Sequence, residues 1–255
     1  MEVGLVKIAE DSDFRKLKTL VDDNTNWKLE YSKNDETKVW TQMVHGCDFK
    51  MVKIHAVLNS ILPDTVFDVL HDPAYRKEWD LHMIESTEIG YLNPNNDVGY
   101  YAVSCPAPLK NRDFVLQRSW LDMGEEKLIL NHSIHHKCYP PKKGFVRAAS
   151  HLTGFVIRSC PRGTFLGYVS HTDPRGKLPP WLVNKITQIF APKMVKQLRK
   201  AVEGYNHWKA RQQNPDFKPW TYPEQMMLAP RISITDCVES HKTSANSLTR
   251  DSDYD

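Results

Sequence analysis

The sequence predicts an α+β fold in which a curved antiparallel sheet of nine strands is closed by one long amphipathic helix. Most of residues 27–171 alternate apolar with polar side chains, in short runs separated by turn-forming clusters. The single long helical pattern comes later, beyond Pro180. A sheet of this size curls, and a helix laid across its concave side would enclose a cavity.

Short elements are expected at the start of the domain. Ser12 is predicted to cap an amphipathic helix whose apolar stripe begins at Phe14. Two further short helices are predicted, the first from Pro63 and the second from Pro73. Between the first helix and these two, the alternating pattern predicts strands at residues 27–31, 38–44 and 50–58.

The strand pattern returns after residue 80 and persists for most of the middle of the chain. Six strands are predicted there, at residues 87–91, 98–105, 114–120, 127–134, 144–157 and 163–171. Between the second and third of them, residues 106–113 contain Pro106 and Pro108 and are expected to form a rigid surface loop.

The long helix is predicted from an apolar stripe with spacings of three and four, and Pro192 should kink it. The stripe comprises Leu182, Ile186, Ile189, Phe190, Met194, Leu198, Val202 and Tyr205. After it, residues 214–224 combine aromatic residues with prolines and are expected to lie over the domain as an ordered strap. We therefore expect an N-terminal extension at 1–11, the domain at 12–222 and a flexible tail at 223–255.

Composition limits the possible classes of protein. The 255 residues are 40% hydrophobic and 25% charged, as in an ordinary soluble domain. There is no apolar run of about 18 residues and no signal-peptide pattern at Met1, so we expect a cytosolic monomer. Five scattered cysteines without C-x-x-C spacing argue against disulfides and zinc, and we expect no metal site and no cofactor.

Positive charge is concentrated in the long helix. Residues 185–211 contain seven lysines and arginines and one acid, although the whole chain has a net charge of only +3. Such a face suits an anionic surface, of a membrane or of nucleic acid. With the resemblance described below, we expect transient contact with a membrane and none with nucleic acid. The predicted docking residues are Lys193, Lys196, Arg199 and Lys200. Ordinary solubility is the alternative explanation.

The segment Tyr75-Arg-Lys-Glu-Trp-Asp80 is the strongest candidate for a binding site. On a helix, Arg76 and Asp80 lie four residues apart on one face, and Tyr75 and Trp79 lie on a neighbouring one. An arginine kept near large rings and oriented by a carboxylate is a preorganised site for an anion. The alternative is a surface ion pair, which would contribute little to stability.

Three stretches together resemble a known family, the START lipid-transfer domains. They are Tyr75-Arg-Lys-Glu-Trp-Asp80, Pro108-Leu-Lys-Asn-Arg-Asp-Phe-Val115 and Gly176-Lys-Leu-Pro-Pro-Trp-Leu-Val-Asn184. The resemblance covers roughly residues 12–222 and is greatest to the subgroup of phosphatidylcholine transfer protein and its phospholipid-binding relatives. It implies a helix-grip fold in which the curved sheet and the last helix enclose one lipid, without an enzymatic reaction.

The resemblance also implies roles for particular residues. Arg76 matches the family's direct phosphate ligand, and Asp80 matches the carboxylate that acts with it. The family's choline cage matches Tyr101, Val103, Phe114 and, by alignment through residues 144–148, His151. For the lipid to leave, either the long helix or loop 106–113 would have to swing away.

Three cage positions depart from the family pattern. Tyr101 stands where the family has Trp, and Phe114 and His151 stand where it has Tyr. A quaternary ammonium is held by ring faces, best by Trp, so this cage is weaker and more polar. Because His151 would accept a hydrogen bond from a primary ammonium, we expect phosphatidylethanolamine to be bound as well as phosphatidylcholine.

Two alternatives remain open at this stage. A sterol or ceramide carrier would use the same fold, but these ligands have no phosphate for Arg76. A START-like hydrolase would need a nucleophile and a base, for which His132, His151, Cys105 and Asp80 are candidates. Neither a G-x-S-x-G motif nor metal-ligand spacing supports the enzyme.

Overall fold

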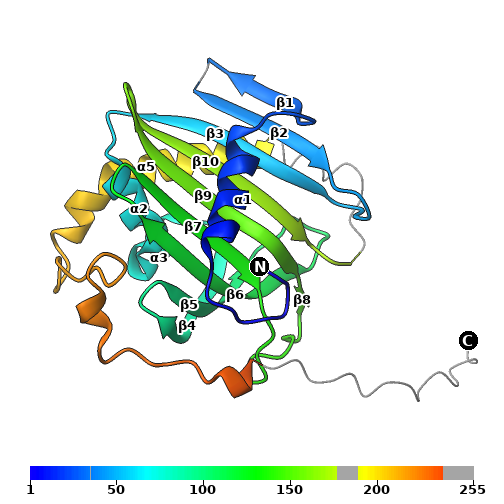
Figure 1. Ribbon diagram of the computed structural model, residues 1–255, viewed down its shortest axis with the longest axis vertical. Coiled ribbons are helices and arrows are strands. Elements are labelled where there is room, and N and C mark those ends of the chain that lie inside the picture. Colours follow the sequence, from blue (N-terminus) through cyan, green and yellow to red (C-terminus); the bar gives the residue numbers. More distant parts are fainter. Residues whose placement is uncertain (35, 177–188, 238–255) are drawn as a thin grey trace, which may run out of the picture.

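The computed structural model describes residues 1–34, 36–176 and 189–237. Its sheet contains ten strands, nine of which follow one antiparallel path in the order β1-β2-β3-β10-β9-β7-β6-β5-β4. The strands are β1 Lys28–Lys33, β2 Thr37–Met43, β3 Lys50–Asn59, β4 Met83–Asn93, β5 Asn96–Val103, β6 Asn111–Asp122, β7 Glu126–Ser133, β8 Phe145–Arg147, β9 Ala149–Cys160 and β10 Gly163–Asp173. The predicted α+β class and curved sheet are confirmed (Figure 1).

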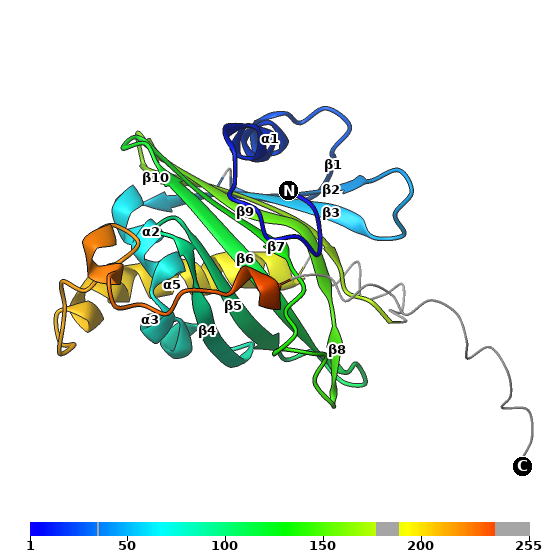
Figure 2. The same ribbon diagram turned by 60° about the horizontal axis from the view of Figure 1, so that its bottom comes forward.

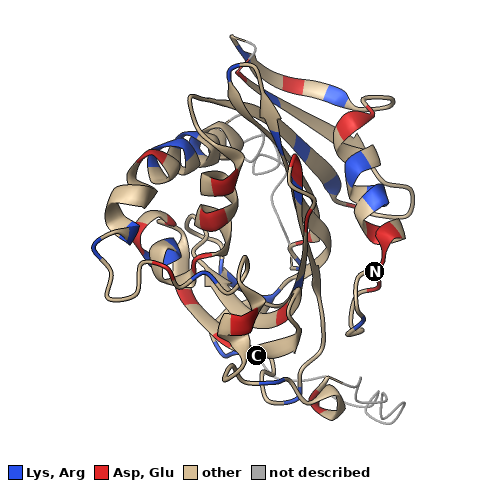
Figure 3. Ribbon diagram, turned by 60° about the vertical axis from the view of Figure 1, so that its left-hand side comes forward, with Lys and Arg blue, Asp and Glu red and all other residues tan. Residues whose placement is uncertain are grey.

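The helices lie on both faces of the sheet. They are α1 Asp11–Asp22, α2 Pro63–His71, α3 Pro73–Trp79 and α5 Ala191–Lys209. Helix α1 covers one face, while α2, α3 and α5 cover the opposite, concave face (Figure 2). Figure 3 views the layers from another side, with α1 outside the sheet and the other helices across from it.

One predicted strand is divided in two. The pattern at 144–157 predicts a continuous strand, but β8 ends at Arg147 and β9 begins at Ala149. Strand β8 pairs with the start of β6 in parallel, and Arg147 forms an ion pair with Asp113 at 3.0 Å. The backbone N–H of Ala148 also donates to the carbonyl of Asp113, at 3.0 Å. These contacts pull 145–147 toward β6, which is why the sheet has a tenth strand that is not antiparallel.

Helix ends also differ from the prediction. Helix α1 begins at Asp11, one residue before the expected cap Ser12, and Asp13 accepts a hydrogen bond from the backbone N–H of Glu10. Helix α5 begins at Ala191 with Pro192 in its first turn, directly after the π-helical residues 189–190. The chain before residue 189 that a kink at Pro192 would reorient lies outside the described residues. The predicted stripe residues Leu182 and Ile186 lie outside the described residues.

Three hydrophobic clusters form in the described part of the chain, the third around Val98 and Val115 of β5 and β6. The largest lies on the concave side and contains the expected helix residues Leu198, Val202 and Tyr205. The second packs Phe14, Leu17 and Val21 of α1 against the other face. Arg112 holds the chain that follows β10, since its guanidinium donates to the carbonyls of Pro174 and Arg175 at 3.0 Å.

The segment beyond residue 222 was expected to be free, but its described part lies against the sheet (Figure 1). Strand β4 is a sheet edge, and its Tyr91 exchanges backbone hydrogen bonds with Pro230 and Ile232, at 2.8 and 3.1 Å. Gly90 permits this approach, because a Cβ there would lie 2.8 Å from the carbonyl oxygen of Pro230. Cys237 is buried beside β5 and β6. The segment thus covers an edge that would otherwise expose unpaired backbone groups.

Burial controls the charge of Lys53 in β3. Its side chain is fully buried, its Nζ donates to the backbone oxygen of Asp23 at 2.7 Å, and the ring of Trp27 lies 4.3 Å away. Loss of hydration outweighs the attraction of Asp23 and Asp22. Burial therefore lowers the pKa of Lys53 to about 8, from an ordinary value of 10.5.

This shift predicts a pH dependence of stability. Between about pH 8 and 10.5 the unfolded state binds the proton of Lys53 more tightly than the folded state, so the free energy of unfolding rises with pH. We expect a gain of up to about 3 kcal/mol from this group across that window. Urea denaturation of the parent and of Lys53→Met at both pH values measures it. Equal pH dependence in the two proteins would contradict the assignment.

Candidate functional site

Helix α3 presents the predicted Arg76–Asp80 pair. It begins at Pro73, and the side chain of Asp72 caps it by accepting hydrogen bonds from the backbone N–H groups of Ala74 and Tyr75. One turn separates Arg76 from Asp80, and Arg76 Nε donates to Asp80 Oδ2 at 3.1 Å. The expected (i, i+4) pair is therefore formed, and the next question is what surrounds it.

Two aromatic rings flank the guanidinium of Arg76. The carbon at its centre lies 5.2 Å from the ring centroid of Trp79 and 5.3 Å from that of Tyr101 in β5. The hydroxyl of Tyr101 donates a hydrogen bond to Asp80. The pair from α3 is thus joined to the concave face of the sheet by a residue that the sequence also singled out.

Burial and charge act against each other at this pair. Burial alone would lower the pKa of Arg76, but interactions with Tyr101 and Asp80 outweigh it, and the pKa is raised. Burial also raises the pKa of Tyr101, so its hydroxyl stays a donor at physiological pH. The side chain of Arg76 nevertheless keeps 32% of its surface accessible, and that of Asp80 keeps 12%. The arginine is therefore charged and only partly covered.

Two of the other cage candidates lie beside Tyr101. Phe114 in β6 is the direct partner of Tyr101 across the two strands, so their side chains share a face. Val103 lies two residues beyond Tyr101 in β5 and points to the same side. Each of the three is partly buried. The structure therefore brings Arg76, Asp80, Tyr101, Val103 and Phe114 to the same side of the sheet.

His151 does not join this group. The pairing of β9 with β10 skips it, because Ser150 faces Thr172 and Leu152 faces His171. Such a bulge reverses the side to which a residue points. The exposed ring of His151 packs on Phe49 and His171, with centroids 5.5 and 5.0 Å away. The expected contact of His151 with a headgroup is therefore corrected.

A row of polar residues on the concave face escaped the sequence analysis. Arg118 in β6 pairs with Asp97 in β5 through both carboxylate oxygens. Asn131, Thr153 and Ser170 are the successive cross-strand partners in β7, β9 and β10. The signal was present, since Arg118 alternates in phase with Phe114 and Trp120 within an apolar strand.

The predicted docking residues are divided by the structure. Lys193, Lys196 and Lys200 are exposed on α5. Arg199 instead turns to the sheet, where it donates to the carbonyl of Val57 at 2.9 Å and lies 3.5 Å from Glu36. Arg199 therefore contributes to the attachment of α5 to β3, and the three lysines remain as the docking candidates.

Three of the four residues considered for a hydrolase have other partners. His132 lies 2.8 Å from the carbonyl of Leu5, Asp80 binds Arg76 and Tyr101, and His151 packs on His171. Within residues 1–34, 36–176 and 189–237, no cluster of three or more potential metal ligands is found. In the same part of the chain no helix is long and apolar enough to cross a membrane.

Comparisons with known proteins agree with this arrangement. The START domain family model matches residues 7–208. START domain-containing protein 10 of Mus musculus is 42% identical over 246 residues, which cover 95% of this chain and 83% of that protein. This chain belongs to the START domain family.

Further similarities extend this result. Phosphatidylcholine transfer protein of Bos taurus is 33% identical to this chain over 158 residues, which cover 60% of this chain and 73% of that protein. The crystal structure of human STARD10 matches with a TM-score of 0.85 at 40% identity, covering 94% of this chain and 98% of the other. Family membership supports a lipid-transfer function.

The Arg118–Asp97 pair gives a test of the electrostatics of the concave face. The side chains of Arg118 and Asp97 are 25% and 7% accessible. Removing one partner of such a pair leaves a poorly hydrated charge, so Asp97→Asn should destabilise the START domain by about 3 kcal/mol. Glu85→Gln, which breaks the exposed pair with Lys142, should cost less than about 1 kcal/mol. Equal urea midpoints for the two variants would refute this difference.

Proposed function

We propose that this START domain binds one glycerophospholipid between its sheet and α5 and carries it between membranes, with no enzymatic step. The observation that carries the proposal is the charged Arg76, oriented by Asp80 and flanked by the rings of Trp79 and Tyr101. A phosphodiester is the part of a membrane lipid that matches a guanidinium. The match to phosphatidylcholine transfer protein, which is named for such a lipid, supports the choice.

Trp79 offers a further donor beside the proposed phosphate site. Its indole N–H is buried and has no hydrogen-bond partner in the described part of the chain. A buried donor without a partner has a substantial free-energy cost, which a phosphate or ester oxygen would offset. This supports an anionic, oxygen-rich ligand next to Arg76.

Partly accessible side chains in the interior support a space for the lipid. Burial opposes the charged forms of both Arg76 and Tyr168 and so acts on the pKa of each, yet neither side chain is fully covered. Surfaces that are accessible but remote from bulk water are expected along the walls of an internal cavity. The partly covered apolar side chains beside the concave core, which include Phe155, Tyr168 and Met194, would receive the acyl chains. Burial of each methylene group contributes about 0.8 kcal/mol.

The proposed headgroup site is formed by Tyr101, Val103 and Phe114. Two ring faces can hold a quaternary ammonium, although less strongly than Trp would. Without a dedicated cage, a primary ammonium that donates to carboxylate or hydroxyl oxygens competes well. We therefore infer that phosphatidylcholine and phosphatidylethanolamine are both ligands, and this inference no longer depends on His151.

Membrane exchange is proposed to take place at α5. Lys193, Lys196 and Lys200 are exposed and each would contribute about 1 kcal/mol of attraction to an anionic leaflet. Such contact would be transient for a cytosolic monomer. Movement of α5 away from the sheet would let the acyl chains pass into the bilayer without meeting water.

The phosphate role predicts the effect of a charge-removing variant. Arg76→Gln should reduce transfer of phosphatidylcholine between vesicles by about tenfold or more, since it removes charge-assisted hydrogen bonds worth about 1.5–3 kcal/mol. The matched control is Lys77→Gln, which changes the exposed neighbour on the same helix. Parent-like transfer by folded Arg76→Gln would reject the phosphate role. A sterol or ceramide found in the purified parent by native mass spectrometry would favour the alternative carrier.

The headgroup site predicts a change in selectivity. Tyr101→Trp should raise the ratio of extracted phosphatidylcholine to phosphatidylethanolamine by about threefold, because Trp gives the best ring face for a quaternary ammonium. Mass spectrometry of lipids extracted from equimolar vesicles measures the ratio. His151→Tyr serves as the control and should leave it unchanged, because this side chain lies on the other face of the sheet. The headgroup assignment fails if His151→Tyr changes the ratio and Tyr101→Trp does not.

A further inference from the structure

Asp72 is a buried carboxylate at the junction between α2 and α3. It is 3% exposed. It is the C-cap residue of α2 and also the N-cap residue of α3. Its Oδ1 accepts hydrogen bonds from the backbone N–H groups of Ala74 at 3.0 Å and Tyr75 at 3.2 Å. The orientation of this single carboxylate therefore determines how α3 begins.

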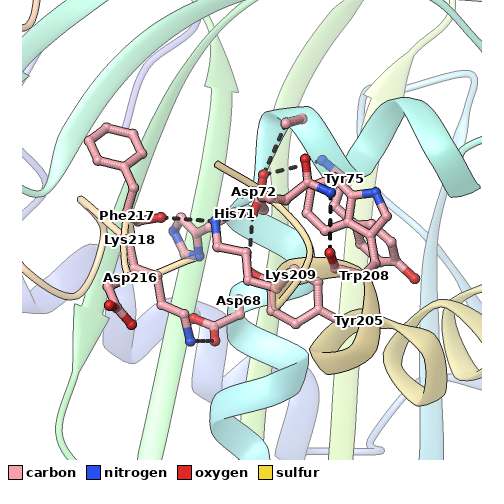
Figure 4. A network of polar contacts seen from close by, with 12 residues as sticks. Asp68, His71, Asp72, Tyr75, Tyr205, Trp208, Lys209, Asp216, Phe217 and Lys218 are labelled. Carbon is pink, nitrogen blue, oxygen red and sulfur yellow. Dashed lines mark hydrogen bonds and ion pairs between the residues drawn. The ribbon is translucent and has the colours of Figure 1, made fainter. Parts of the chain in front are cut away.

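The other oxygen of Asp72 is held from the C-terminal half of α5. Oδ2 accepts hydrogen bonds from the hydroxyl of Tyr205 at 3.0 Å and from Nζ of Lys209 at 2.8 Å (Figure 4). Lys209 also donates to the carbonyl of Phe217 at 2.9 Å. All four contacts of the Asp72 side chain are thus hydrogen bonds, and two of them come from a helix more than 130 residues away.

Helix α3 needs such support because it is short. It has seven residues, and helices of this length do not persist without tertiary contacts. A second contact comes from Tyr75, whose hydroxyl donates to the carbonyl of Ala201 in α5 at 2.7 Å. Gly204 leaves room for that hydroxyl, since a Cβ there would lie 3.2 Å from it. These two contacts join the first turn of α3 to α5, in addition to the contact of Asp80 with Tyr101 in the sheet.

Arg76 comes directly after Tyr75 in α3, one turn beyond Asp72. Its backbone N–H donates to the carbonyl of Asp72 at 3.0 Å, in the first full turn of the helix. We propose that Asp72 and Lys209, with Tyr205, are positioning residues that hold α3 so that Arg76 meets the phosphate of the ligand. The proposal rests on the function proposed above. It gives the C-terminal half of α5 a role in lipid selectivity, separate from any gating movement of the same helix.

A second buried carboxylate provides a matched control. Asp68 lies one turn earlier on α2 and accepts hydrogen bonds from Nζ of Lys218 at 2.6 Å and from the indole N–H of Trp220 at 2.7 Å. This pair also fixes residues after α5, as Figure 4 shows for Lys218, but Asp68 accepts none of the N-terminal N–H groups of α3. Loss of Lys218 should therefore affect stability without displacing Arg76.

The experiment measures selectivity for the phosphate. Full-length protein is incubated with vesicles containing equimolar phosphatidylcholine and diacylglycerol with identical acyl chains, and the lipids of the re-isolated protein are quantified by mass spectrometry. Lys209→Met should lower the ratio of phosphatidylcholine to diacylglycerol by about tenfold, and Tyr205→Phe, which removes a single hydrogen bond, by about threefold. Lys218→Met should retain the parent ratio.

A double variant distinguishes positioning from general damage. In Lys209→Met the charge of Asp72 has lost its partner, whereas adding Asp72→Asn removes that charge and keeps an oxygen able to cap α3. The double variant should recover most of the parent ratio. If Lys209→Met does not fold, the comparison of Tyr205→Phe with Lys218→Met decides the question, because both are milder changes.

The outcomes separate the two proposals. A parent without preference for phosphatidylcholine over diacylglycerol overturns the proposed function, and the positioning role with it. A parent with that preference, unchanged in Lys209→Met and Tyr205→Phe, overturns only the positioning role. An equal loss of selectivity in Lys218→Met also overturns it, because that result would reflect general loosening of α5.

Discussion

The site depends on one interaction, the hydrogen-bonded ion pair between the guanidinium of Arg76 and the carboxylate of Asp80. Arg76 loses part of its hydration inside the protein, and the interactions with Asp80 and Tyr101 compensate so fully that its pKa is raised. The rings of Trp79 and Tyr101 limit where the group can lie. A group held in this way meets an anion with little loss of side-chain entropy.

The elements around this group are held by apolar packing of α5 on the sheet and by buried polar contacts. Apolar packing between α5 and the concave face is not directional, so by itself it would allow α5 to slide. The carboxylates of Asp68 and Asp72 are directional, and they join α2 and α3 to α5 and to the residues after it. The part of α5 near Tyr205 is therefore fixed with respect to α3.

Several parts of this arrangement followed from local patterns. The curved sheet was predicted because period-two alternation determines which residues face a core, and the long helix because its apolar stripe has helical spacing. The Arg76–Asp80 pair was predicted because a separation of four residues on a helix brings two side chains together in any fold. Tyr101, Val103 and Phe114 were found through a family resemblance, and strand register then explained why they share one side.

Other parts could not follow from local patterns. His151 was misassigned because a single β-bulge reverses the alternation, and no residue in the segment marks where the bulge occurs. Arg199 has the same charge as the lysines beside it on α5, yet it binds Val57 in β3. Strand β8 exists because Arg147 reaches Asp113, which lies 34 residues earlier in the chain.

The sequence by itself determined the fold class, the main strands, the family and the local geometry of the Arg76–Asp80 pair, because each depends on contacts between near neighbours or on a repeating pattern. Only the tertiary structure decided that Tyr101 completes the pair, that His151 faces away, and that Lys209 and Tyr205 hold the cap of α3. These contacts join distant segments. They depend on strand register and on how helices cross the sheet, and neither is encoded in any short stretch of residues.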